Sequence, residues 1–190
     1  SPSPAMANVY LKKDHVRSHK PVDLYALAAW STWVLVCAKH LQGAAQYQPG
    51  IINLDFLRKV AKLSRSEDGP LLARAFLLQH GIAVVIEPHL PKTYIDGAAM
   101  MAPSGQPVIG LTLRRDRIDN FWFVLMHELV HIWRHVRTSN SLFFDDLDEE
   151  ANTDRQEKEA DELARGALIP RSVWDRSHAR VLRSPDAAKL

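Results

Sequence analysis

The hydrophobic positions in the first half of the chain recur at the spacing of helices. A first helix is expected over residues 23–40, with Asp23 as its cap. A shorter helix follows from Asn53 or Asp55, and a third is expected over residues 70–79. The first helix carries four apolar residues at helical spacing, which are its candidate core residues: Trp30, Trp33, Val34 and Cys37.

The hydrophobic period changes to that of β-strands near residue 82. Residues 82–86 form a short β-branched run, and residues 94–101 and 107–113 form two further strands. A four-residue turn with one glycine separates the last two, so they are expected to form a hairpin. Helices, a small sheet and then more helices indicate the α+β class, with a mostly antiparallel sheet of about three strands.

An almost wholly apolar segment, residues 121–133, follows the strands and predicts a buried helix. Asp119 or Asn120 is its expected cap. Burial makes the ionisable residues inside this segment informative, because an unpaired buried charge is costly.

Three ionisable residues in this helix, His127, Glu128 and His131, form the pattern H-E-x-x-H. Helix residues four apart share a face, so the two imidazoles can bind one zinc ion. The glutamate beside the first histidine can then act as a base on the metal-bound water. The alternative is a pair of core histidines hydrogen-bonded to other groups, but one metal would compensate all three residues at once.

Tetrahedral zinc needs a third protein ligand, with water in the fourth position. His135 is the first candidate, but it lies roughly 12 Å beyond His127 along a continuous helix. It cannot join His127 on one ion without a helix break, so it is expected at the edge of the site or in solvent.

The second source of a ligand is an acidic segment, residues 145–162, which holds ten acids and two bases. Thr153 resembles the start of a capping box and would begin a helix there. Glu157 lies on the inward apolar stripe of that helix, and Asp161 follows one turn later. This spacing suits a glutamate ligand and an acid that accepts a hydrogen bond from a ligand histidine. Glu159 is the competing ligand, and each acid could instead be a surface carboxylate.

Length and composition indicate one globular domain, residues 1–190. The chain has 190 residues, of which 46% are hydrophobic and 24% charged. Within it we expect an arm (1–20), a helical part (21–80), and a part with the sheet and zinc site (81–190). Cys37 is the one cysteine, so an intramolecular disulfide and an all-cysteine metal site are excluded. No signal peptide is visible, and a cytoplasmic protein is expected.

Membrane and nucleic-acid partners are not indicated. The longest apolar stretch, residues 24–38, is shorter than the roughly 20 residues of a membrane span. The formal net charge of +2 is too small to indicate nucleic-acid binding. The second and third helices could be mistaken for a DNA-reading helix-turn-helix, but their apolar faces and the lack of a compact glycine turn favour helices that pack into a core. Nucleic acid is expected only through an upstream or partner domain.

Two segments together, residues 121–135 and 156–170, resemble the ImmA/IrrE family of metallo-endopeptidases. The resemblance implies a small sheet packed against the H-E-x-x-H helix, and Glu128 as the catalytic base. It also implies zinc bound by three residues: His127, His131 and Glu157. Two positions depart from the common family pattern: Val130, where glycine is frequent, and Asp161, where asparagine is common.

The resemblance also implies a class of partner. Several family members cleave or inactivate a repressor with a helix-turn-helix, and others are fused to such a domain, as in HigA-like regulators. The start at Ser1 would suit a fragment of such a fusion.

Two functions fit these residues. The first is a zinc-dependent endopeptidase that binds its protein substrate along a strand edge. The second is a non-catalytic zinc-binding module of a transcriptional regulator or toxin–antitoxin system. For the peptidase, a second contact to the oxyanion could come from one of three residues: His135, Tyr94 or His178.

Overall fold

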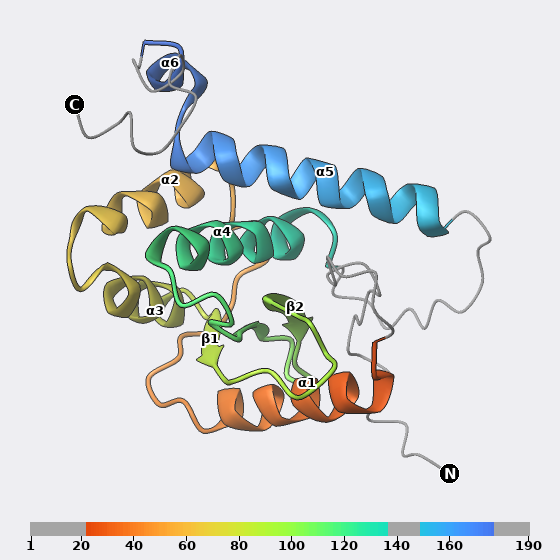
Figure 1. Ribbon diagram of the computed structural model, residues 1–190. Helices are drawn as coiled ribbons and strands as arrows, with labels where there is room; N and C mark the ends of the chain where they lie inside the picture. The colour runs from red at the N-terminus through yellow and green to blue at the C-terminus, as the bar shows by residue number, and fades with distance from the viewer. Residues whose placement is uncertain (1–21, 137–148, 177–190) are drawn as a thin grey trace.

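The computed structural model describes residues 22–136 and 149–176, the first six residues of the second stretch by their backbone alone. These residues form six α-helices, a 3-10 helix and a three-stranded sheet (Figure 1). The helices are α1 (Leu24–Lys39), α2 (Leu54–Lys62), η3 (Leu63–Arg65), α3 (Gly69–Gln79), α4 (Ile118–Arg134), α5 (Glu149–Leu168) and α6 (Arg171–Trp174). The strands are β1 (Ala83–Ile86), β2 (Gly97–Met101) and β3 (Pro107–Leu111). The predicted α+β class is confirmed, and no helix of the described residues is long and apolar enough to cross a membrane.

Strand β3 is the centre of the sheet, whose order is β1-β3-β2. It pairs antiparallel with β2, with Gly97 opposite Leu111, which confirms the predicted hairpin. It also pairs with β1, but in parallel, with Ala83 opposite Val108. The parallel pair arises because the chain leaves β1, crosses to the far edge of the sheet to form β2, and only then turns back through the centre. The sheet is therefore mixed, with the longer pairing antiparallel.

Helix α1 covers one face of the sheet (Figure 1). The carboxylate of Asp23 caps it, accepting hydrogen bonds from two backbone N–H groups of the first turn at 3.1 Å. Trp30 and Val34 face the sheet and are buried, whereas Trp33 is 55% exposed, so its predicted place in the core is wrong. A helix lying on a sheet buries only one stripe of its surface. Trp30 packs directly on Gly110 of β3, where a Cβ atom would come within 2.6 Å of the indole ring.

Helix α4 covers the opposite face, with α5 against its outer side and α2 and α3 at one end (Figure 1). Successive strand residues point to opposite faces, so each strand contributes to both cores. This explains why the strands are apolar throughout. The side chains that face α1 include Ala83, Val85 and Val108, and those that face α4 include Val84, Ile109 and Leu111.

Two predicted helix starts are wrong. The N-cap of α4 is Arg117, so Asp119 and Asn120 lie in its first turn. The Asp119 carboxylate accepts a hydrogen bond from Arg117 Nε at 2.9 Å instead of capping the helix. Helix α5 begins before Thr153, because the glutamates and alanine that precede this residue are good helix formers. For α2, the structure selects Asn53 as the cap over Asp55.

Candidate metal centre

Helix α4 holds His127, Glu128 and His131 in a buried position against the sheet. Their exposed fractions are 6%, 2% and 5%, although each is ionisable. The neighbouring positions on α4 are apolar and pack into the core, which fixes this part of the helix. The sequence thus places three polar groups where water cannot readily solvate them, and each needs a compensating partner.

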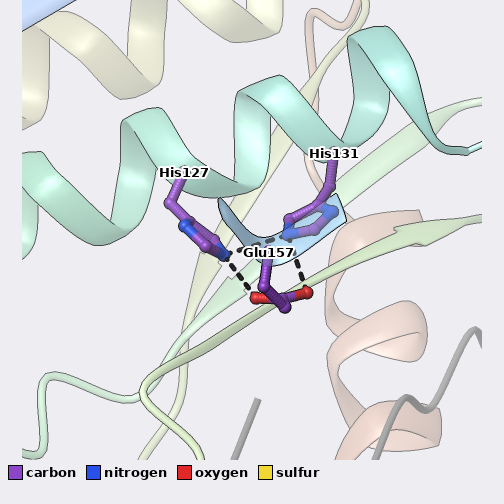
Figure 2. Close-up of side chains that lie close together, drawn as sticks. All are labelled: His127, His131 and Glu157. Atoms are coloured by element: carbon purple, nitrogen blue, oxygen red, sulfur yellow. Dashed lines mark hydrogen bonds and ion pairs between the residues drawn. The ribbon is translucent and has the colours of Figure 1, made fainter. Parts of the chain in front are cut away.

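Helix α5 brings Glu157 to the two histidines (Figure 2). The carboxylate oxygens of Glu157 lie 3.1 Å from His127 Nε2 and 3.3 Å from His131 Nε2. The two Nε2 atoms lie 2.9 Å apart. Ligand atoms around a tetrahedral zinc ion with bonds of about 2.0–2.1 Å are about 3.3 Å apart. The three side chains could therefore hold one metal ion.

Asp161, one turn beyond Glu157 on α5, contacts the other ring nitrogen of His127. Its Oδ1 lies 3.1 Å from His127 Nδ1, and its Oδ2 accepts a hydrogen bond from Arg165 at 2.7 Å. A carboxylate only accepts hydrogen bonds, so His127 Nδ1 carries the proton. The lone pair of the ring is then on Nε2, which points at Glu157 and His131. This donor set suits a cation.

The charges around His127 also favour a cation at this position. Burial lowers the pKa of its imidazole, but the hydrogen bond that the protonated ring donates to Glu157 and the negative charges of Glu128, Glu157 and Asp161 outweigh burial and raise the pKa above its ordinary value. The site thus attracts positive charge, either as a proton on His127 or as a metal ion that replaces it.

His135 and Glu159 form a separate contact next to the centre. The side chain of His135 is 6% exposed, and its Nδ1 lies 3.0 Å from His131 Nδ1. His135 was predicted at the edge of the site or in solvent, and in the structure it lies at the edge of the site. Glu159, the competing ligand, pairs with Arg134 at 2.8 Å and with His135 at 3.2 Å. The hydrogen bonds from Arg134 and His135 lower the pKa of the Glu159 carboxyl.

Glu128 lies where α4 meets the edge strand β2. A Cβ atom on Gly97 would come within 2.5 Å of Val124 Cγ1 and 3.1 Å of Glu128 Oε1, so only glycine allows this approach. The Oε2 atom of Glu128 is buried and has no hydrogen-bond partner among the described residues. Glu128 is thus a buried carboxylate at the contact of α4 with β2, and its role as a catalytic base stays a prediction.

A model of the IrrE N-terminal-like domain, peptidase family M78, matches residues 78–182. The chain belongs to this family. The match runs from the end of α3 beyond α6 and includes every residue of the candidate centre. No curated protein and no solved structure shows a significant match.

Membership makes this chain a metallopeptidase-type domain of the ImmA/IrrE group. Val130, where the common family pattern has glycine, is fully buried in the apolar core around α4. Its side chain therefore fills core volume within the helix layer.

Sequence reasoning missed three contacts of the IrrE-like centre. Arg165 holds Asp161, Arg134 holds Glu159, and His135 contacts His131. Spacing alone could have suggested two of them, because Arg165 is four residues from Asp161 and His135 is four from His131. Of the oxyanion candidates, Tyr94 lies in the loop before β2 with a left-handed backbone (φ 51°), and His178 lies outside the described residues. All three candidates, His135 included, stay predictions for the second oxyanion contact.

Proposed function

We propose that this domain is a zinc-dependent endopeptidase that hydrolyses a peptide bond in a protein partner. The observation that carries the proposal is the convergence of two imidazole nitrogens and one carboxylate, from His127, His131 and Glu157, beside the buried Glu128. Two histidines and a glutamate are a donor set of catalytic zinc sites, which keep a fourth position open. When bound there, zinc would polarise the substrate carbonyl and make the attacking water more acidic.

Glu128 is the proposed catalytic base. It is adjacent to His127 on α4, and its carboxylate is not among the three groups that could hold the metal ion. It would accept a proton from the attacking water and then deliver that proton to the leaving amine. Burial keeps competing water away from the carboxylate, so the proton passes between the reacting groups.

Strand β2 is the proposed binding edge for the substrate. It is one of the two edge strands in the order β1-β3-β2, and it is the one that begins at Gly97 next to Glu128. An extended peptide could add to this edge through main-chain hydrogen bonds, which would bring one of its carbonyl groups to the centre. We propose a repressor with a helix-turn-helix as the substrate, which would place the reaction in the cytoplasm.

The test is the substitution Glu128→Gln, which keeps shape and hydrogen bonding but cannot accept a proton. Zinc content and thermal stability should stay nearly unchanged, while cleavage of a helix-turn-helix repressor encoded beside the gene should fall about 10²–10⁴-fold. Glu162→Gln is the matched control, because Glu162 is an exposed carboxylate on α5. If wild type and Glu128→Gln control the repressor equally well in cells, the domain is a non-catalytic zinc-binding regulatory module.

A further inference from the structure

A continuous line of hydrogen bonds extends from the candidate centre to the surface through His131. His131 Nδ1 lies 3.0 Å from His135 Nδ1, and His135 Nε2 lies 3.2 Å from Glu159 Oε2. Glu159 Oε1 in turn accepts a hydrogen bond from Arg134 Nε at 2.8 Å. His131 and Arg134 are on the last turns of α4 and His135 is its C-cap, whereas Glu159 is on α5, so the line joins the two helices that form the centre.

Hydrogen-bond chemistry assigns a direction to this line. Glu159 is ion-paired with Arg134, and an ionised carboxylate only accepts, so His135 Nε2 donates to it. A neutral imidazole that donates from one nitrogen accepts at the other, so His135 Nδ1 accepts from His131 Nδ1. The lone pair of His131 is then on Nε2, which points at Glu157.

The hydrogen-bond assignment is best defined at His131 and His135, because these two side chains are buried. The side chains of His131 and His135 are both 6% exposed, whereas those of Glu159 and Arg134 are 35% and 48% exposed. An imidazole that is removed from water needs a protein partner for each of its nitrogens. A side chain at position 135 that cannot accept a hydrogen bond would remove this acceptor from His131 Nδ1–H and, with it, a restraint on the orientation of the ring.

We propose that His135 and Glu159 are positioning residues that fix the ring and the tautomer of His131 for metal binding. Asp161, held by Arg165, contacts Nδ1 of His127 in the same way, but there the carboxylate contacts the ligand histidine directly, without an intervening imidazole. Outer partners of ligand histidines commonly contribute 10–100-fold to metal affinity. The proposal rests on the proposed zinc centre.

The test measures zinc affinity by competition with a chromophoric chelator. His135→Leu removes the acceptor and should weaken zinc binding about 10–100-fold. His135→Asn keeps an acceptor near the place of Nδ1 and should stay close to wild type, whereas His135→Gln moves it outward and should resemble the leucine variant. The visible absorption of bound Co²⁺ should change in the leucine and glutamine variants and not in the asparagine variant, because it reports ligand geometry.

A double-mutant cycle tests whether Glu159 acts through His135. Glu159→Ala should weaken zinc binding in the wild-type background and cause no further loss in the His135→Leu background. Glu162→Ala, an exposed acid on the same helix, should change nothing in either background.

The outcomes separate this proposal from the one on which it rests. A wild type that binds no zinc overturns the proposed function. A wild type that binds zinc, with equal affinity in His135→Leu or with no difference between His135→Asn and His135→Gln, overturns the positioning role alone. If His135→Leu does not fold, the comparison of the asparagine and glutamine variants decides.

Discussion

The two faces of the sheet are covered by helices of opposite character. On the α1 face the core is a cluster of apolar side chains, and the hydroxyl of the buried Ser31 donates to the Leu27 carbonyl at 2.9 Å. On the α4 face an apolar core of similar kind surrounds three buried ionisable residues, His127, Glu128 and His131. The α1 face contributes apolar packing that stabilises the fold, whereas the α4 face holds ionisable side chains in a buried position. The difference predicts that stability and chemistry can be changed separately.

The largest expected effect on stability belongs to the α1 face. Trp30→Ala should lower the free energy of unfolding by about 3–5 kcal/mol, because it empties a buried site against Gly110. Trp33→Ala on the same helix is the control and should stay within about 0.5 kcal/mol, since Trp33 is exposed. Denaturant unfolding measures both. If folded Trp30→Ala protein had lost its zinc, stability on the α1 face and metal binding on the α4 face could not be changed separately.

The next effect belongs to the third ligand. Glu157→Ala should lower zinc affinity by more than about 100-fold, beyond the loss typical of outer partners, because it leaves two protein ligands. The loss should exceed that of Glu159→Ala, which acts only through His135. Chelator competition ranks the two variants. A greater loss in Glu159→Ala would mean that the ligand had been assigned to the wrong carboxylate.

A smaller effect is expected at Asp161. Asp161→Ala should weaken zinc binding about 10–100-fold, because it removes the acceptor for His127 Nδ1–H. Asp161→Asn keeps an acceptor oxygen and loses only the charge that pairs with Arg165, so most of the affinity should remain. Equal losses in the two variants would show that charge, and not hydrogen bonding, is what Asp161 contributes.

The smallest predicted effect has the opposite sign. Glu128→Leu should raise the stability of the metal-free protein by about 1–2 kcal/mol, because it replaces a buried carboxylate, whose Oε2 has no hydrogen-bond partner in the described part of the chain, by an apolar group of similar size. Thermal unfolding in the presence of a chelator measures the change. A decrease in stability would indicate that the α4 face depends on this carboxylate for packing.

The sequence allowed prediction of those parts of the site that depend on helix periodicity. The spacing of His127 and His131 places them on one face of a helix, and the apolar stripe of α5 turns Glu157 inward. The contact of His135 with Glu159 could not be predicted in this way. The spacing of four residues allows His135 to contact His131, but its hydrogen bond to Glu159 depends on how α4 ends and where α5 lies.

The fold shows the same division between local and long-range information. The hairpin of β2 and β3 follows from a short turn, and the cap at Asp23 from local chemistry. The parallel pairing of β1 with β3 depends on which edge of the sheet the chain crosses to, which no local pattern encodes. The exposure of Trp33 likewise depends on how α1 is rotated on the sheet.

The most direct measurement of the central claim is the zinc content of purified protein, determined by native mass spectrometry. The account predicts about one zinc ion per chain in the wild type and in Glu128→Gln. It predicts the loss of most zinc in His127→Ala and His131→Ala, because a three-ligand site reduced to two binds far more weakly. A wild type without zinc, or full zinc occupancy in His131→Ala, would contradict it.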